Sequence, residues 1–208
     1  MRSFQVHSGQ IVRIGEAGEP VLIDSDWEPK IEDIAHGLSR ICRFGGHVDP
    51  EMYSVAQHTV LCAEAARDGG YDAVVQLACL LHDANEAYNQ DVISPVKAAM
   101  RRYQTSEGLK SAYDVIELSF QERIALAFLG KDATAMFSQV VNYYDIAMFV
   151  TESQQVRTES PETAEFNKAK FPAPLAIVID PWPSWKAKEK FLNAYADLKE
   201  KIERGRTA

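Results

Sequence analysis

The chain begins with β-like apolar runs and continues with a pattern that is helical almost to its end. In the β-like part, apolar residues cluster in three short runs, at residues 4–7, 11–14 and 21–23. Turn sequences that contain glycine separate these runs, which is typical of short strands. We therefore expect residues 1–30 to form a small hairpin or meander that lies against the main body.

From Pro29 onward, apolar residues recur at the three- and four-residue spacing of helices. Ser54 begins a capping-box sequence, Ser94-Pro95 supplies a cap and a first-turn proline, and Gly45-Gly46 is a stop signal. These signals predict helices from 29 to the Gly45-Gly46 pair, at about 54–67 and 72–88, from 94 onward, and at about 106–129, 133–157 and 184–204. The expected fold is mainly α, a compact bundle of about seven helices.

The stretch 158–183 contains five of the nine prolines, and we expect it to be a long connection with one strand at 175–179. A length of 208 residues is enough for one domain with a hydrophobic core. The expected organisation is therefore a single domain: a β-like extension (1–30), a helical core (30–157), and a connection with a C-terminal helix (158–208).

Composition and charge narrow the classes of function. The apolar fraction (46%) and charged fraction (25%) are those of an ordinary globular protein. A net charge of −8 argues against binding to duplex DNA, which depends on cations that neutralise phosphates, but a small anion needs only a few local cations and a metal. No apolar run approaches the roughly 18 residues of a membrane span, and no secretory signal is expected. Cys42, Cys62 and Cys79 form no CxxC pair and are interpreted as reduced core residues of a cytoplasmic protein.

Two polar positions interrupt apolar helical faces. His82-Asp83 breaks the most apolar helix, and Glu86 follows at the spacing that shares a helix face with both. The alternative is a helix end that turns into solvent. His58 lies among apolar residues of the preceding helix, where a lone histidine is more often a satisfied core residue than a ligand.

A third position, Asp145, changes this balance. Val141, Met148 and Phe149 surround it at helical spacing, and a buried carboxylate needs a partner, for which a metal is the simplest choice. Asp114, the rival candidate, shares its helix face with polar residues and is expected to be solvated. His58, His82, Asp83 and Asp145 together suit one divalent ion, such as Mn²⁺, Co²⁺, Fe²⁺, Ni²⁺ or Zn²⁺, with Mg²⁺ as a further alternative.

The spaced set His58…His82-Asp83…Asp145 resembles the HD-domain phosphohydrolase superfamily, and more narrowly the bacterial HD-domain 5′-deoxynucleotidases and related small deoxynucleoside triphosphate phosphohydrolases. The resemblance covers about residues 30–157. It extends to an arginine fifteen residues before the first histidine and to two further sequences, His82-Asp83-x-x-Glu86-x-x-x-x-Asp91 and Ser94-Pro95-Val96-Lys97. The resemblance implies an HD-domain helical bundle.

The resemblance also implies roles for individual residues. Four of them would hold the metal: His58, His82, Asp83 and Asp145. Glu86 and Asp91 would flank the scissile phosphate and handle the attacking water and the leaving oxygen, while Arg43 and Lys97 would bind the phosphate. Phe44 stands where these nucleotidases carry a tryptophan that crowds the sugar and rejects ribose. Phenylalanine is smaller, so the resemblance does not determine the sugar.

The residues support this chemistry without the family, although each has a second interpretation. Arg43 offers a fork of donors that matches two phosphate oxygens, or it is a cation favoured at a helix C-terminus. Lys97 lies in a first helical turn, where a cation is unfavourable unless an anion binds there. Glu86 or Asp91 can act as base and the other as acid. Asp91 can also simply end its helix.

The leading hypothesis is therefore an HD-type phosphohydrolase that cleaves (deoxy)nucleoside 5′-monophosphates to nucleoside and phosphate. The alternative within this chemistry is a deoxynucleoside triphosphate triphosphohydrolase, with Arg101, Arg102 and Lys110 as sources of the extra cations. The alternative from another class is a non-catalytic helical module that binds a nucleotide or a metal. The expected partner is a small nucleotide, with no duplex nucleic acid and no membrane, and the apolar helices after residue 106 leave room for a homodimer.

Overall fold

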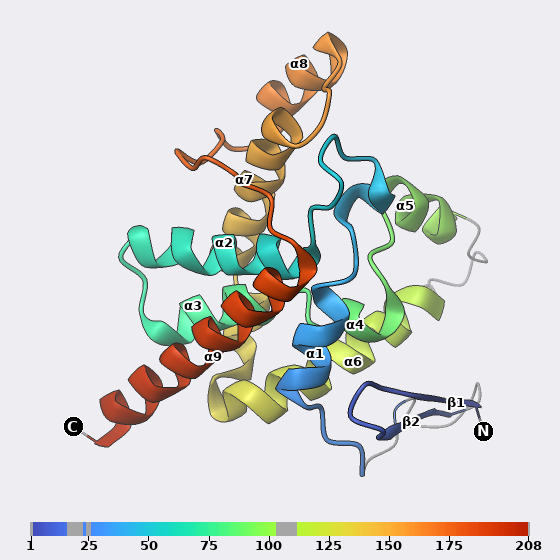
Figure 1. Cartoon of the computed structure of the whole chain (residues 1–208), viewed down its shortest axis with the longest axis vertical. Helices are drawn as coiled ribbons and strands as arrows, with labels where there is room; N and C mark the ends of the chain where they lie inside the picture. The colour runs from blue at the N-terminus through green and yellow to red at the C-terminus, as the bar shows by residue number, and fades with distance from the viewer. Residues whose placement is uncertain (1, 16–22, 24–25, 103–111, 208) are drawn as a thin grey trace.

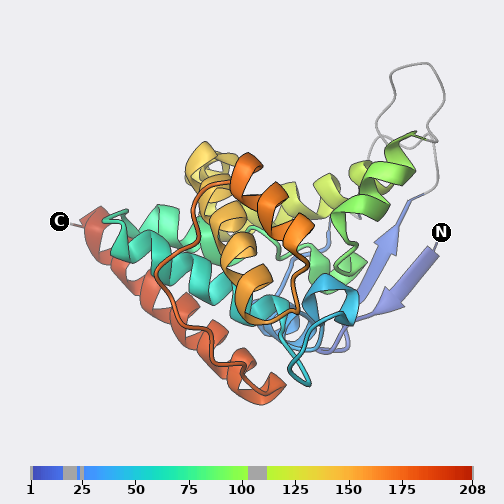
Figure 2. The same ribbon diagram turned by 90° about the horizontal axis from the view of Figure 1, so that it is seen from above.

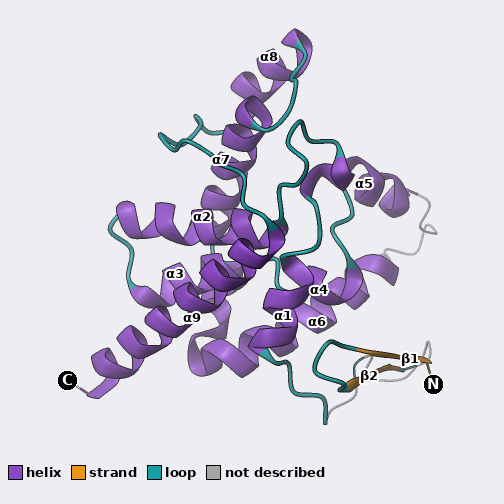
Figure 3. Cartoon of the chain, in the orientation of Figure 1, coloured by secondary structure: helices purple, strands orange, loops and turns teal. Residues whose placement is uncertain are grey.

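The computed structural model describes residues 2–15, 23, 26–102 and 112–207, and most of them are helical (Figure 3). In chain order the α-helices are α1 (Ile31–Leu38), α2 (Val55–Asp68), α3 (Ala73–Leu81), α4 (Glu86–Asn89), α5 (Ser94–Arg102), α6 (Ala112–Leu129), α7 (Gln139–Gln155), α8 (Pro161–Lys170) and α9 (Ser184–Thr207), with 3₁₀ helices η1 (Arg43–Gly46) and η2 (Gly130–Phe137). The prediction of a mainly α fold is confirmed. The two α-helices that the sequence did not lead us to expect are α4 and α8.

The predicted N-terminal hairpin is present. Strands β1 (Arg2–Gln5) and β2 (Ile11–Ile14) pair antiparallel at one side of the molecule, beside the N-terminus (Figure 1). Its inner side joins a small apolar cluster of Val12, Ile23, Trp27 and Phe120. The hairpin loop is also tied to α1, because the Ser8 amide and hydroxyl donate to the two oxygens of Asp33, each at 2.7 Å.

The main core lies around α3, whose residues from Gln76 to Leu81 are all buried. This helix packs against α2, α6, α7 and α9, and the long α9 runs across α2 and α3 (Figures 1 and 2). The helix that is most apolar in the sequence thus lies at the centre of the bundle. Its C-terminal end is therefore surrounded by other elements, which is where His82-Asp83 lies.

The first predicted helix ends earlier than expected. Helix α1 stops at Leu38, and the chain does not remain helical to Gly45-Gly46. Instead, residues 41–43 run antiparallel to residues 53–55: the Arg43 amide donates to the Tyr53 carbonyl at 2.9 Å, and the Val55 amide donates to the Ile41 carbonyl at 3.0 Å. These long-range backbone hydrogen bonds replace helical ones and place Arg43 next to the start of α2.

The third predicted helix, at 72–88, is broken. Helix α3 ends at Leu81 and α4 begins at Glu86, with a turn between them. Gln121 on α6 stabilises the break, because its side-chain amide donates to the carbonyls of Leu81 and His82 and its oxygen accepts from the Asn85 amide. The interpretation of Glu86 as a neighbour of His82 on one continuous helix face was therefore wrong.

The stretch 158–183 was also interpreted incorrectly. It contains helix α8, which Ser160 caps and Pro161 opens at a position where proline loses no hydrogen bond. No strand forms at 175–179 among the described residues. The backbone there bonds to side chains of α7 instead: Leu175 N to the Thr151 hydroxyl, and Ile177 O and Ile179 N to the Gln155 amide.

Two smaller differences concern helix boundaries. The Val96 and Lys97 amides of α5 donate to the Ile93 carbonyl, so Ile93 takes the cap position predicted for Ser94, and the helix starts at Ser94. The helix expected from 133 begins as 3₁₀ helix η2, and Ser138 then caps α7. The predicted residues 106–111 of the fifth helix, and 21–22 of the third β-like run, lie outside the described residues.

The length and hydropathy of the described helices bear on whether they could cross a membrane. No one of them is both long and apolar enough to cross a bilayer, although the bent pair Ala112–Phe137 and Gln139–Gln155 reaches that length and composition together.

Candidate metal centre

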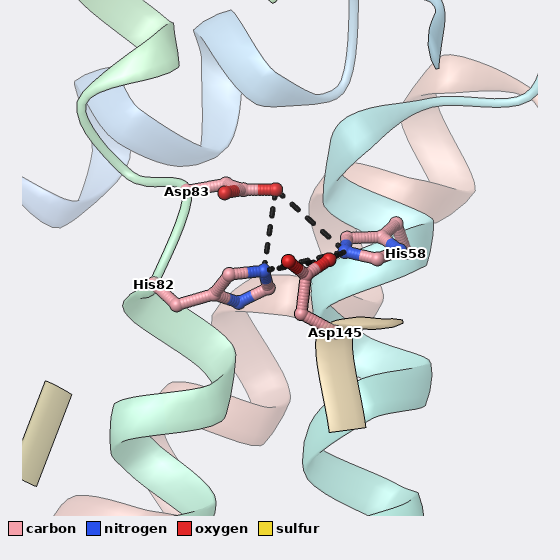
Figure 4. Close-up of side chains that lie close together, drawn as sticks. All are labelled: His58, His82, Asp83 and Asp145. Atoms are coloured by element: carbon pink, nitrogen blue, oxygen red, sulfur yellow. Dashed lines mark hydrogen bonds and ion pairs between the residues drawn. The ribbon is translucent and has the colours of Figure 1, made fainter. Parts of the chain in front are cut away.

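Four side chains converge where α2, α7 and the end of α3 meet (Figure 4). His58 comes from α2, Asp145 from α7, and His82 and Asp83 directly follow α3. One ligand atom from each lies within 4.8 Å of those of the other three. The structure thus brings together all four residues that the sequence predicted as metal ligands, and this group can hold a metal ion.

Hydrogen bonds behind the two imidazole rings determine which nitrogen faces the centre. His82 Nδ1 donates to the Cys79 carbonyl at 2.7 Å, and His58 Nδ1 donates to a Glu152 carboxylate oxygen at 2.6 Å. Both partners are acceptors, so Nδ1 carries the proton in both rings and the Nε2 lone pairs point inward. The two Nε2 atoms lie 3.3 Å apart, and His58 Nε2 lies 3.2 Å from Asp145 Oδ1.

When both imidazoles are neutral, the four atoms that face the centre are all acceptors, and positive charge between them is favourable. Burial would lower the pKa of His82, but the charges of Asp83 and Asp145 outweigh it, and the pKa stands well above its usual value. Burial would raise the pKa of Asp145, yet its hydrogen bonds with His58 and His82 hold that pKa well below the usual range. The pKa of Asp83 is lowered to about 2 against the effect of burial, chiefly by the charge of His82. Such a field attracts a cation.

The donor set fits a borderline divalent ion. Two imidazole nitrogens and two carboxylate oxygens are the ligands that Mn²⁺, Fe²⁺, Co²⁺, Ni²⁺ and Zn²⁺ share, and four ligands leave positions for water and substrate. Asp145 is the most open member, with a side chain 36% exposed, while His58 is fully buried. Asp114 lies outside the group and pairs with Arg101 instead. The choice of Asp145 over Asp114 therefore agrees with the structure.

Glu86 is a buried carboxylate next to the centre. The residue is 5% exposed, and its Oε2 atom is buried without a hydrogen-bond partner among the described residues. Burial, reinforced by the charges of Asp83 and Asp91, holds the pKa of Glu86 well above its usual value. Burial also raises the pKa of Asp91, with Arg43 acting against it and Asp83 with it. Both groups thus lie within the field of the centre and hold their protons to higher pH than ordinary carboxyl groups do.

Arg43 is a buried cation in contact with one member of the centre. It is 8% exposed, its Nε donates to Glu152 at 3.1 Å, and its Nη1 lies 3.4 Å from Asp83 Oδ2. The next residue, Phe44, has its ring between two guanidinium groups, those of Arg43 at 5.6 Å and Arg157 at 4.6 Å from the ring centroid. The cation and the aromatic residue predicted to contact substrate therefore both lie beside the centre.

Lys97 is close to the site but has a partner. Its Nζ lies 2.6 Å from a Glu117 oxygen, and it lies 5.5 Å from the centroid of the Tyr113 ring. The charge of Glu86 also helps to raise the pKa of Lys97, so the two side chains share one region. The structure therefore places Lys97 near the predicted catalytic residues while Glu117 compensates its charge.

A small cavity and two strained residues mark the same region. The cavity, of about 200 Å³, has His82 and Asp83 in its wall together with Asn85, Glu117 and Phe137. In the described chain, Phe44 (φ 57°) and Gln90 (φ 69°) are the residues other than glycine with positive φ. One follows Arg43 and the other precedes Asp91. Such backbone strain concentrates at functional sites, so it supports these two segments as parts of one site.

One important residue was missed in the sequence. Glu152 is fully buried on α7 and contacts both His58 and Arg43. A signal was available, since Glu152 follows Asp145 by seven residues, two helical turns, and so lies on the same helix face. The carboxylate reads as an ordinary exposed glutamate unless the helix is known to be buried on that face.

Comparisons with known proteins carry no named activity. No family model matches the chain. It is 35% identical over 127 residues to the uncharacterized protein YfdR of Escherichia coli (strain K12), a match that covers 61% of this chain and 60% of that protein. It is 46% identical over 74 residues to an uncharacterized protein of Rhodobacter capsulatus, which covers 34% of this chain and 38% of the relative. The chain thus matches less than two thirds of the length of either relative.

Proposed function

We propose that this chain is an HD-domain, metal-dependent phosphohydrolase that cleaves (deoxy)nucleoside 5′-monophosphates to nucleoside and phosphate. The observation that carries the proposal is the group of His58, His82, Asp83 and Asp145, whose ligand atoms lie within 4.8 Å of one another. A carboxyl group that favours its protonated form, Glu86, and a buried cation, Arg43, lie beside that group.

Each residue has a distinct task in this proposal. A divalent ion held by the four ligands would polarise the phosphate. It would also lower the pKa of a water molecule bound to it to about 7. Arg43 would bind two phosphate oxygens through the end of its guanidinium fork. Glu86, which keeps its proton at higher pH than an ordinary glutamate, would donate that proton to the leaving oxygen. Asp91 would orient the attacking water.

A monophosphate is favoured over a triphosphate by the state of the nearby cations. Arg101, the first residue considered for the β- and γ-phosphates, forms a two-point ion pair with Asp114, with contacts of 2.8 Å and 3.0 Å. Arg102 is exposed near the end of α5, and Lys110 lies outside the described residues. The cations that remain for this role near the centre, Arg43 and Lys97, would suit one phosphate group.

The non-catalytic alternative is less consistent with Glu86. A structural metal site needs only its ligands and has no use for a further buried carboxyl group with an unpartnered oxygen. A group of this kind is typical of sites that transfer protons.

A nucleotide panel tests the proposal. The purified protein is loaded with Mn²⁺ or Co²⁺ and incubated separately with AMP, dAMP and dATP. We expect inorganic phosphate from a monophosphate and no triphosphate from dATP. The Asp83→Ala protein, purified in the same way, controls for contaminating phosphatases. Release of triphosphate from dATP would establish the rival activity, and no product from any substrate would overturn the proposal.

A further inference from the structure

Glu152 accepts hydrogen bonds from three segments of the chain. Its side chain has no exposed surface. One oxygen, Oε1, lies 2.6 Å from His58 Nδ1 on α2 and accepts from the Tyr53 hydroxyl at 2.8 Å. The other oxygen, Oε2, accepts from Arg43 Nε at 3.1 Å. The carboxylate therefore connects a predicted metal ligand with the predicted phosphate-binding arginine.

The two oxygens have different consequences for the site. The bond to Oε1 keeps the proton on His58 Nδ1, so that the Nε2 lone pair faces the metal centre. The bond to Oε2 occupies Nε of Arg43. It leaves the two terminal nitrogens, at the end of the guanidinium fork, to bind an anion. One of these, Nη1, makes only a long contact of 3.4 Å with Asp83, so an anion can replace Asp83 as its partner.

The donors around Glu152 explain why its charged carboxylate is stable although it is buried. Burial alone would raise its pKa, but the neighbouring Arg43 and His58 outweigh this effect and lower it. An ionised carboxylate with three donors is satisfied without solvent. These contacts would stabilise the fold even without a ligand. The same contacts also reach two residues of the candidate site.

We propose that Glu152 is a positioning residue that couples metal binding to phosphate binding, because one carboxylate orients both His58 and Arg43. This inference rests on the proposed function for the identity of the two ligands. It goes further in assigning the orientation of both the metal ligand His58 and the phosphate-binding Arg43 to one shared carboxylate. Loss of the Glu152 charge disturbs both, through separate oxygens.

The substitution Glu152→Gln separates the two oxygens. Glutamine can still accept from His58 and Tyr53 through its carbonyl, but its NH₂ group then faces Arg43 Nε, and two donors oppose each other. Tyr53→Phe is the matched control, because it removes a hydrogen bond to the same carboxylate without touching His58 or Arg43. A purely structural role for Glu152 predicts similar behaviour of the two variants.

Two binding measurements test the coupling without turnover. Calorimetry with Mn²⁺ reports on the metal centre, and titration of the Mn²⁺-loaded protein with inorganic phosphate reports on Arg43. For Glu152→Gln we expect Mn²⁺ affinity to fall about tenfold, at the low end of the effect of changing the partner of a metal-bound histidine, because a neutral acceptor replaces the carboxylate behind His58. Phosphate affinity at saturating Mn²⁺ should also fall, by about tenfold, through the misplaced arginine. Tyr53→Phe should keep both affinities within about twofold of the wild type.

Arg43→Lys distinguishes the two arms of the proposal. Lysine has no Nε donor, so adding Glu152→Gln to this variant should lower phosphate affinity little further, while Mn²⁺ affinity should still fall as in the single variant. The proposal is overturned if Glu152→Gln binds Mn²⁺ and phosphate like the wild type, or if Tyr53→Phe reproduces both losses.

These outcomes separate the inference from the proposed function. A protein that binds Mn²⁺ and phosphate, with the losses expected for Glu152→Gln, but hydrolyses no nucleotide, would retain the coupling and refute the nucleotidase. A protein that hydrolyses dAMP while Glu152→Gln is unchanged in both affinities would do the reverse. A wild-type chain that binds no divalent ion would refute both.

Discussion

Two buried glutamates beside the centre have opposite environments. Glu152, the inner one with no exposed side-chain surface, accepts three hydrogen bonds, and its pKa is lowered despite burial. Glu86, the outer one at 5% exposed, has an oxygen without a partner among the described residues and two acidic neighbours, and its pKa is raised, chiefly by burial. The same type of side chain is therefore held in its charged form in one place and keeps its proton to higher pH than usual in the other. Donors, rather than depth, decide between the two roles.

Substitution of Asp83, a predicted metal ligand that is close to both Arg43 and Glu86, is expected to have the largest effect. Asp83→Ala removes a carboxylate that contacts the histidines and Arg43, and we expect metal affinity to fall by more than about a hundredfold, since even loss of an outer partner lowers it 10- to 100-fold. Phosphohydrolase activity should fall to background. Calorimetry with Mn²⁺ and a phosphate-release assay measure the two effects. Tight metal binding by this variant would remove Asp83 from the ligand set.

Glu86→Gln tests the outer glutamate alone. Glutamine has nearly the same shape but carries no transferable proton, so kcat should fall by about 10²- to 10⁴-fold while Mn²⁺ affinity stays within a few fold. Steady-state kinetics with dAMP and metal calorimetry check this. Glu189→Gln, an exposed substitution on α9, is the control. Wild-type turnover in Glu86→Gln would show that the assignment of roles to the two glutamates is wrong.

The same variant sharpens the comparison through stability. The folded protein holds the Glu86 proton to higher pH than the unfolded chain, so above the ordinary pKa of 4.5 it binds more protons than the unfolded state. The free energy of unfolding therefore falls as pH rises, by at most about 1.4 kcal/mol per pH unit, until the folded pKa is passed. Urea denaturation of metal-free protein from about pH 5 to about pH 8 should show a steeper loss in the wild type than in Glu86→Gln, which keeps only the contributions of the other groups with raised pKa, such as His82 and Asp91. Parallel curves would contradict the raised pKa.

Substitution of Lys97, which lies near Glu86, is expected to have the smallest effect. Its charge is paired with Glu117, and both side chains are partly exposed, so its contribution to phosphate binding is on the order of 1 kcal/mol. Lys97→Met should raise KM for the monophosphate by about threefold to tenfold with little change in kcat. Lys190→Met on the exposed face of α9 is the control. A fall in kcat equal to that of Glu86→Gln would place Lys97 in the chemical step.

Much of the site was predictable because its members violate local patterns. His58 and Asp145 are polar residues on apolar helical faces, and His82-Asp83 interrupts the most apolar helix. Each violation requires a partner, and a shared metal is the simplest one. Glu152 escaped notice although it is more deeply buried than Asp145, because its partners lie far away in the sequence: Arg43 is 109 residues away and His58 is 94.

The errors in the fold have a common cause. Residues 39–45 and 82–85 have sequences that suit helices, and both leave the helix because of hydrogen bonds with distant segments. Tyr53 and Val55 bind the first segment, and Gln121 binds the second. These two departures are what bring Arg43 and the pair His82-Asp83 to the centre.

The sequence by itself determined the mainly helical class, the N-terminal hairpin, the apolar central helix and the identity of the four acceptor side chains, because periodicity, capping residues and misplaced polar groups are local properties. Only the tertiary structure decided that these side chains meet, that the helices break beside them, and that Glu152 and Glu86 differ. The physical reason is that a carboxylate's charge depends on the donors and burial around it, and segments distant in the chain supply both.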